Sequence, residues 1–178
     1  MAGTARILAI CGSTRKNSSN LKLLRKIAAV SEESFSFSFF EDIDKLPHFN
    51  PDLDSKNPPK IIIDFRNKIE YADAILICTP EYVFSIPGSL KNALEWCVST
   101  VIFSNKPVGI ITASASGEMG KAEIELIMKT LGANFSEKTS ILIKGIQGKL
   151  DEQGNFTDSL TEKIIKQFIE DFEKQIFI

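Results

Sequence analysis

Short apolar runs recur along the chain and alternate with longer segments of helical periodicity. Strands are predicted over Arg6–Cys11, Phe35–Phe40, Ala74–Thr79, Lys106–Thr112 and Thr139–Ile143. The runs RILAIC and AILICT are almost wholly apolar, which is typical of parallel strands that are buried on both faces. The run FSFSFF alternates instead, and it therefore predicts a strand near an edge of the sheet.

Apolar residues spaced three and four positions apart predict a helix after each of these strands. The expected helices are Ser18–Val30, Lys60–Tyr71, Pro87–Val98, Ser116–Leu131 and a last helix that begins near Ser159. Proline suits the first turn of a helix, as at Pro87, and Ser116 is a candidate N-cap. Ser159 and Glu162 have the spacing of a capping box. The segment Lys45–Pro59 contains four prolines and predicts an irregular loop.

The alternation of strands and helices predicts an α/β fold, with one parallel sheet and helices on both faces. Five strands in a doubly wound arrangement favour the flavodoxin-like strand order 2-1-3-4-5. In such sheets, ligands bind beyond the carboxyl ends of the strands, where the strand order reverses. The loops Gly12–Asn20, Pro80–Ser85 and Ala113–Gly117 leave those ends, so we expect the site among them. The length of 178 residues suits one domain over residues 1–178.

Composition and charge argue against several classes of partner and site. The formal net charge of −2 supplies no attraction to nucleic acid or to an anionic membrane. No apolar run approaches the ~20 residues that span a bilayer, and the first residues lack the pattern of a signal peptide, so a cytoplasmic protein is expected. Cys11, Cys78 and Cys97 form no CxxC pair and no metal pattern, and we expect them to be buried apolar side chains.

Trp96 and Arg66 lie in predicted helices and not in these loops. Trp96 lies in a predicted helix, where it is equally compatible with the core and with a contact between subunits. Arg66, together with Lys60 and Lys68, is expected on a solvated helix face.

The first loop has the composition of an anion-binding site. It joins a buried strand to a helix, and the first turn of a helix offers unpaired N–H groups and a partial positive charge. Ser13, Ser18 and Ser19 add hydroxyl donors, Asn20 adds a cap or a donor, and Arg15 adds a planar fork suited to phosphate. Neither GxxxxGK[ST] nor GxGxxG occurs, so a mononucleotide phosphate is favoured over a pyrophosphate. A plain polar loop with a capped helix is the alternative.

Residues 12–20 have the sequence GSTRKNSSN, and residues 80–95 have the sequence PEYVFSIPGSLKNALE. They resemble the motifs GSxRxxSxN and PEYNxSxPGxLKNAxD of the NAD(P)H-dependent FMN reductase family, in the same order and each after a predicted strand. Two positions depart from the family pattern, since Val83 replaces asparagine and Glu95 replaces aspartate. The loss of the amide at Val83 removes a polar contact near the flavin, unless that contact is made by the backbone. Phe84 is bulky where small or polar residues are frequent.

The resemblance implies an FMN site built from three loops. The implied cofactor-binding residues are Ser13, Arg15, Ser18, Ser19, Asn20, Leu21, Pro80, Glu81, Tyr82, Val83, Ser114, Ser116 and Gly117. Residues 114–117 match the family's SxSxG rim loop in part, because the glycine comes one place early. Glu81 either faces solvent or accepts from a backbone N–H. No catalytic side chain and no metal ligand is implied, because hydride transfer to a flavin needs no protein base on the donor side.

The resemblance further implies an oxidoreductase that passes hydride from NADPH or NADH through FMN to a small acceptor. Quinones, free flavins, azo compounds and metal oxyanions are the implied acceptors, and a homodimer or homotetramer is the implied assembly. A flavodoxin-type electron carrier and a flavin-binding protein without catalysis are the alternatives. Arg15 and the nearly neutral charge argue against the carrier, because such carriers are usually acidic and hold phosphate with neutral donors.

Overall fold

The strands form one parallel sheet in the order β2-β1-β3-β4-β5, and the predicted strand order is confirmed. The computed structural model describes residues 4–177. Its strands are β1 (Ala5–Cys11), β2 (Phe35–Phe40), β3 (Ala74–Thr79), β4 (Val108–Ser114) and β5 (Ser140–Lys144). The central strand β3 is buried along its whole length, whereas β2 lies at an edge and alternates between buried and exposed positions. Both observations agree with the apolar patterns of the two segments.

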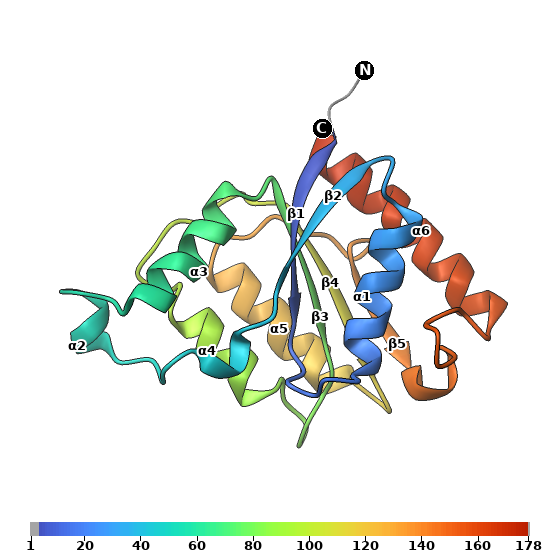
Figure 1. The fold of residues 1–178 in the computed structure, drawn as a ribbon, viewed down its shortest axis with the longest axis horizontal. Helices are drawn as coiled ribbons and strands as arrows, with labels where there is room; N and C mark the ends of the chain where they lie inside the picture. Colours follow the sequence, from blue (N-terminus) through green and yellow to red (C-terminus); the bar gives the residue numbers. More distant parts are fainter. Residues whose placement is uncertain (1–3, 178) are drawn as a thin grey trace.

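Helices cover both faces of the sheet, which confirms the doubly wound α/β class (Figure 1). They are α1 (Ser19–Val30), α2 (Pro51–Asp54), α3 (Lys60–Tyr71), α4 (Gly88–Glu95), α5 (Glu118–Thr130) and α6 (Ser159–Phe177), with the 3-10 turns η1 (Ile43–Lys45) and η2 (Ile146–Gly148). α1 and α6 pack on one face, and α3, α4 and α5 pack on the other. The carboxyl ends of the strands point to the bottom of Figure 1, where their loops gather.

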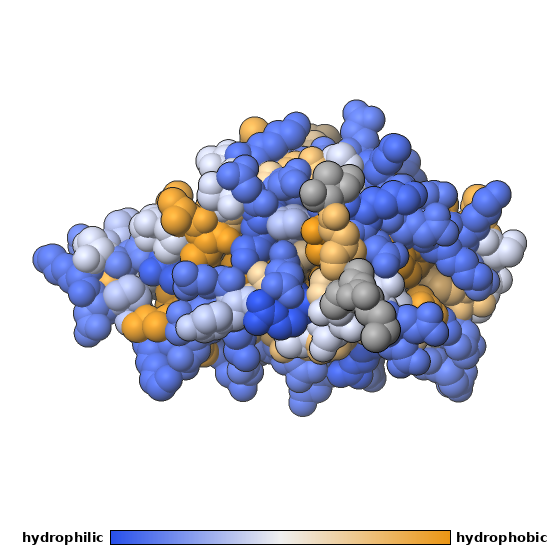
Figure 2. All heavy atoms as spheres, turned by 90° about the horizontal axis from the view of Figure 1, so that it is seen from above, coloured by the Kyte–Doolittle hydropathy of each residue, from blue (hydrophilic) through white to orange (hydrophobic). Residues whose placement is uncertain are grey.

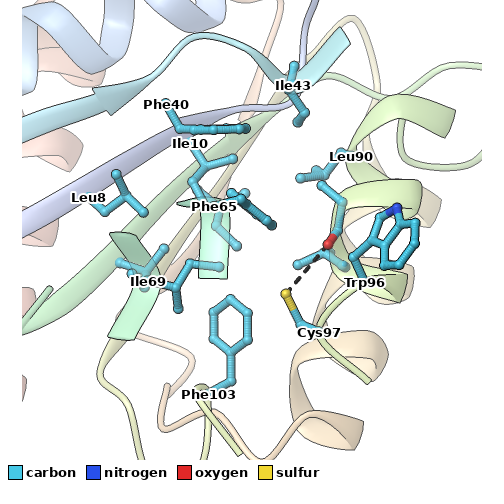
Figure 3. Close-up of a cluster of buried hydrophobic side chains, with 14 of the residues drawn as sticks. Leu8, Ile10, Phe40, Ile43, Phe65, Ile69, Leu90, Trp96, Cys97 and Phe103 are labelled. Atoms are coloured by element: carbon cyan, nitrogen blue, oxygen red, sulfur yellow. Dashed lines mark hydrogen bonds between the residues drawn. The ribbon is translucent and has the colours of Figure 1, made fainter. Parts of the chain in front are cut away.

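Each face of the sheet has its own hydrophobic core. On the α3–α5 face, Phe65, Trp96 and Phe103 are almost fully buried among strand residues such as Ile10 (Figure 3). The Trp96 indole N–H donates to the Pro47 carbonyl at 2.8 Å, so this tryptophan belongs to the core and is no subunit contact. Each fully buried side chain of this size contributes roughly 1.5–3 kcal/mol, which fixes the helices against the sheet.

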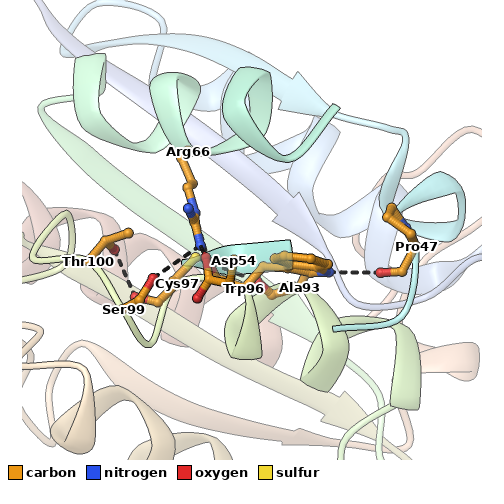
Figure 4. A network of polar contacts seen from close by, with 8 residues as sticks. All are labelled: Pro47, Asp54, Arg66, Ala93, Trp96, Cys97, Ser99 and Thr100. Atoms are coloured by element: carbon orange, nitrogen blue, oxygen red, sulfur yellow. Dashed lines mark hydrogen bonds and ion pairs between the residues drawn. The ribbon is translucent and has the colours of Figure 1, made fainter. Parts of the chain in front are cut away.

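Arg66 lies in a buried polar network, and its predicted place on a solvated helix face is wrong. Its guanidinium forms an ion pair with Asp54, and the two side chains are only 13% and 5% exposed. It also donates from Nε to the Trp96 carbonyl at 2.7 Å (Figure 4). The partner carboxylate comes from α2, a one-turn helix that the proline-rich segment was not expected to contain. α2 is capped by Asn50, whose side chain accepts from the Asp52 N–H.

Two local predictions need correction at the ends of elements. The last helix is capped by Asp158, whose carboxylate accepts from the Leu160 and Thr161 N–H groups at 3.2 Å each. The predicted capping box of Ser159 and Glu162 is therefore wrong by one residue. The strand predicted from Lys106 begins at Val108 instead, since Pro107 has no N–H for the strand ladder.

The end of the molecule opposite the loops is mostly hydrophilic, with separate hydrophobic areas between polar side chains (Figure 2). Among the helices of residues 4–177, none is both long enough and apolar enough to cross a bilayer.

Candidate functional site

The loops after β1, β3, β4 and β5 surround one cavity of about 300 Å³ at the carboxyl edge of the sheet. Its lining consists of Ser13, Arg15, Ser18, Ser19, Asn20, Pro80, Glu81, Tyr82, Ala113, Ser114, Ala115, Gly145, Ile146 and Gln147. The cavity therefore lies where β1 and β3 meet, which is the point at which the strand order reverses. Its volume is within the range of roughly 300–1,000 Å³ that is typical of small-molecule sites.

The first loop presents donors toward this cavity. Ser18 caps α1, and its Oγ accepts from the Asn20 N–H at 3.2 Å. Ser13 is buried, and its Oγ accepts from the Arg15 N–H at 3.4 Å. The Arg15 guanidinium is exposed and forms no ion pair within residues 4–177. The loop thus combines hydroxyls, a helix N-terminus and a free guanidinium, which is the donor set that favours a phosphate.

Asn20 holds the start of α1 against the sheet. Its Nδ2 donates to the Ala113 carbonyl at 3.1 Å, and its Oδ1 accepts from the Cys78 thiol at 3.1 Å. These contacts join α1 to β3 and β4 beneath the cavity. Both polar atoms of this side chain are bonded within the protein. A ligand therefore meets the backbone of Asn20, or neighbouring groups that Asn20 holds in place.

The three cysteines are buried and free, as predicted. Burial raises the pKa of the Cys11 thiol and raises that of Cys78 well above its usual range. Burial also raises the pKa of Cys97 to about 12. A thiol that stays protonated is a poor nucleophile, so these side chains act as packing groups.

Glu81 connects the loop after β3 with the N-terminus of α5. Its carboxylate accepts from the Gly120 N–H at 2.7 Å, the Gly117 N–H at 3.3 Å and the Ser116 hydroxyl at 3.0 Å. These hydrogen bonds, that of Gly120 first, hold the pKa of Glu81 below its usual range. The side chain of Ser116 was a candidate cap for this helix, but Gly117 takes the N-cap position and Glu81 supplies the oxygen acceptors. The carboxylate also stands at the positive end of the helix dipole.

Residues 82–85 form a tight two-residue turn beside the cavity. The Tyr82 N–H donates to the Ser85 carbonyl at 2.8 Å, and the Ser85 N–H donates back at 3.1 Å. Val83 and Phe84 have φ angles of 53° and 59°, the pattern of a type I′ turn. Glu123 of α5 fixes the end of the turn, since its Oε2 accepts from the Ser85 hydroxyl at 2.6 Å and the Ile86 N–H at 3.0 Å. The turn is therefore held rigidly, and its tip is exposed.

Most of the site residues predicted from the sequence surround this cavity. Those that line it are Ser13, Arg15, Ser18, Ser19, Asn20, Pro80, Glu81, Tyr82 and Ser114. Leu21 lines a neighbouring cavity, Val83 is 95% exposed at the tip of the turn, and Ser116 and Gly117 bind the Glu81 carboxylate. Ala113, Ala115 and Gly145–Gln147 were missed. Gly145, directly after β5, was the sequence feature that could have indicated residues 145–147 as part of the site.

The geometry fits a flat ligand with an anionic end better than it fits hydrolytic chemistry. The lining combines serine hydroxyls and the Arg15 guanidinium with Tyr82, Ile146 and small residues. Within the described part of the chain, no group of three or more His, Cys, Asp or Glu side chains is arranged to hold a metal ion. The donor set therefore suits a phosphorylated, largely aromatic cofactor such as a flavin mononucleotide.

Comparison with known proteins agrees with this chemistry. A family model described as NADPH-dependent FMN reductase matches residues 5–138. A probable NADPH:quinone oxidoreductase 1 of Oryza sativa subsp. japonica is 35% identical over 173 residues, and the match covers 92% of this chain and 88% of the relative. A 2-hydroxy-1,4-benzoquinone reductase of a Burkholderia species is 32% identical over 174 residues, with 94% and 93% of the two chains covered.

A solved structure is similar over the whole fold. The flavoenzyme NAD(P)H:(acceptor) oxidoreductase FerB of Paracoccus denitrificans superimposes with a TM-score of 0.83 at 27% identity. The match covers 97% of each chain. The flavodoxin-like fold that the strand pattern predicts is thus confirmed by topology and by a solved relative.

Proposed function

The chain belongs to the NADPH-dependent FMN reductase family, and we propose that it passes hydride from NAD(P)H by way of FMN to a quinone. Membership makes it an oxidoreductase that works with FMN and NAD(P)H. The choice of a quinone rests on the relatives named quinone reductases. The observation that carries the proposal is the convergence of two separate sequence motifs, residues 12–20 and 80–95, on one cavity at the carboxyl edge.

We propose that the first loop holds the FMN phosphate. Ser13, Ser18 and Ser19 offer hydroxyl groups, and the unpaired Arg15 guanidinium offers two parallel donors. The amino end of α1 adds its partial positive charge. Asn20 positions this end through its bonds to Ala113 and Cys78.

The remaining walls suit the ring and the ribityl chain. Pro80, Glu81 and Tyr82 form one wall, and Ser114 and residues 145–147 form the other. Glu81 fixes the loop after β3 to the start of α5, because its carboxylate accepts from the Gly120 N–H. Its hydrogen bonds leave it no free role as a general base. Val83, Ser116 and Gly117 support the site from outside the lining of the cavity.

The protein binds the cofactor, orients the reactants and excludes water from them. When bound, FMN supplies the carrier chemistry between a two-electron donor and an acceptor. The polypeptide needs no side chain as nucleophile, and its three cysteines are buried. Orientation of two reactants by a rigid site is itself a large part of such catalysis.

A purified sample tests the proposal in two steps. Addition of FMN to the apoprotein should give a protein-bound flavin spectrum, and anaerobic NADH or NADPH should bleach it. Steady oxidation of NAD(P)H with 1,4-benzoquinone should follow. A flavin that binds and is never reduced by NAD(P)H would instead indicate a flavin-binding protein without catalysis, and reduction without turnover on any acceptor would indicate an electron carrier.

We further propose that the chain forms a homodimer through the side of α5 next to the turn at residues 82–85. Met119 and Leu126 are spaced for one helix face and are 56% and 66% exposed. Val83 and Phe84 are also exposed, at the tip of the turn that Glu123 of the same helix binds. Light scattering should give the mass of a dimer, or of a tetramer built from dimers. Leu126→Glu should shift the mass toward the monomer. A wild-type monomer at all concentrations would contradict the assembly and leave the flavin chemistry untouched.

The five strands form one sheet, and helices α1, α3, α4, α5 and α6 contribute to the two cores on its faces, which supports the proposal that residues 1–178 form one domain. The cytoplasmic location stays a prediction.

A further inference from the structure

A second cavity of about 410 Å³ lies on the other side of the first loop. It is formed by the carboxyl ends of β1 and β2, the first turns of α1 and the segment 41–45. Ser13 and Arg15 line both this cavity and the first one. The two cavities are therefore neighbours, with the proposed phosphate loop as their common wall.

The lining of the second cavity has three chemical regions. Ala9, Leu21 and Phe39 provide an apolar surface, and Phe39 and Leu21 are only partly buried in the adjacent core. Lys16 and Arg25 provide cationic side chains beside Arg15. The acidic side chains come from residues 41, 42 and 44, directly after β2.

Lys45 and Asp42 of this lining are paired with each other at 2.7 Å, but other charges of the cavity are available to a ligand. Lys16 forms no ion pair within residues 4–177. Arg25 approaches Glu41 only at 3.4 Å, and both side chains are more than 60% exposed. Exposed ion pairs of this kind contribute little to stability, so a phosphate can replace Glu41 as the partner of Arg25.

We propose that the second cavity binds the adenosine diphosphoribose half of NAD(P)H. The inference rests on the proposed function, because it assigns a place to the donor of that reaction. The apolar surface suits an adenine ring, and Lys16 and Arg25 suit the diphosphate. In Rossmann dinucleotide-binding folds a carboxylate about 20 residues after the glycine-rich loop accepts from ribose hydroxyls; Glu41, directly after β2, supplies a carboxylate to this cavity although the glycine-rich loop of that fold is absent.

The shared wall explains how one donor reaches both sites. A dinucleotide whose adenosine half lies in the second cavity passes Arg15 before it enters the first cavity, in which the flavin is proposed to bind. Positive charge at the loop then serves two anions, the phosphate of the cofactor and the diphosphate of the donor. Two bound anions would account for the three neighbouring cationic side chains Arg15, Lys16 and Arg25, because a single phosphate monoester needs fewer.

The test compares donors with and without the adenosine half, using the FMN-loaded protein. Lys16→Ala/Arg25→Ala should raise the KM for NADH and NADPH at least tenfold. It should leave the rate with 1-benzyl-1,4-dihydronicotinamide, which has no adenosine, unchanged. Lys26→Ala is the matched control, since Lys26 is on the same helix and bonds Asn155 outside the cavity.

A binding measurement gives a second readout that is independent of turnover. Calorimetry should detect ADP-ribose or its 2′-phosphate bound to the wild type, with the affinity reduced at least tenfold in the double variant and reduced in Glu41→Gln. An unchanged KM in the double variant, or no binding of either probe, would overturn the inference. A wild type that neither binds FMN nor oxidises NAD(P)H would instead refute the proposed function, so the two failures are distinguishable.

Discussion

The Glu81 carboxylate accepts a hydrogen bond of 2.7 Å from the Gly120 N–H, so a residue of the loop after β3 caps the N-terminus of α5. The contact is close, because a Cβ added at Gly120 would lie 3.2 Å from the Glu81 Cβ. Two walls of the candidate flavin site are thereby held by one carboxylate. Glu123 adds a second bond between the same helix and the same loop.

Glu81→Ala should lower the free energy of unfolding by about 1–2 kcal/mol, because it removes a helix cap and leaves N–H groups unpaired. The pKa of Glu81 is lowered in the fold. Its contribution is therefore present above the ordinary carboxylate pKa, and it is lost as pH falls through the folded value. Urea denaturation at neutral and at acidic pH measures both effects. Glu32→Ala, in an exposed turn, is the control, and equal losses for the two variants would contradict the capping role.

Val83→Asn should stabilise the protein by about 0.5–1 kcal/mol. Valine at a φ of 53° is strained, whereas asparagine tolerates this left-handed conformation. The side chain is 95% exposed, so little packing is lost. The measurement is the midpoint of denaturant unfolding. Val101→Asn, which is 81% exposed and lacks a positive φ, should bring no such gain. A similar gain in both variants would show that polarity, rather than backbone strain, is responsible.

Arg66→Met should lower the free energy of unfolding by about 3–5 kcal/mol, because it leaves Asp54 buried without its charged partner. Asp54→Leu should have a similar effect. The double variant should lose less than the sum of the two single losses, since it removes both buried charges. Chemical denaturation of the wild type, the two single variants and the double variant completes a double-mutant cycle. Additive losses of unfolding free energy would indicate that the two side chains do not interact.

Acid should weaken the contact between the ends of β1 and α3. Arg6 donates to both carboxylate oxygens of Asp73, from Nη2 at 2.7 Å and from Nε at 3.0 Å, and holds the pKa of that carboxyl at about 2 rather than 3.8. Because the pKa of Asp73 is lower in the folded state, the ion pair stabilises the fold above pH 3.8, and this stabilisation is lost as the pH falls toward 2. After allowance for solvent screening, the loss is on the order of 1 kcal/mol. The free energy of unfolding of Asp73→Asn should depend less on pH between 3.8 and 2 than that of the wild type. An equal dependence on pH in the two proteins would refute the assignment.

Local patterns were sufficient for the sheet and for the position of the site. Apolar runs located all five strands, and nine of the residues that line the cavity were predicted individually from the loops after three of these strands. The expected alternative in which Glu81 accepts from a backbone N–H is confirmed, but its partners could not be identified, because residues 116–120 lie more than thirty positions away. The buried ion pair of Arg66 was missed for another reason, because its partner Asp54 lies in a short helix of the proline-rich segment that has no apolar periodicity.

Errors at single positions have local physical causes. Asp158 competes successfully with Ser159 for the cap of α6, since its carboxylate reaches two N–H groups. Gly145–Gln147 were missed because β5 ends the sheet, and edge loops in this fold usually lie away from the switch point. The turn at Val83 could not be predicted either, since valine disfavours the conformation that the turn requires.

The affinities of the apoprotein for FMN and for riboflavin test the central claim most directly, because the two ligands differ only in the phosphate. Fluorescence titration should show FMN bound at least about a hundredfold more tightly, as expected from two or more charge-assisted hydrogen bonds. Arg15→Ala should weaken FMN about tenfold or more and leave riboflavin unchanged, while Lys129→Ala, at the far end of α5, should change neither. Equal affinities for the two ligands, or FMN affinity that survives Arg15→Ala, would contradict a phosphate held at the first loop.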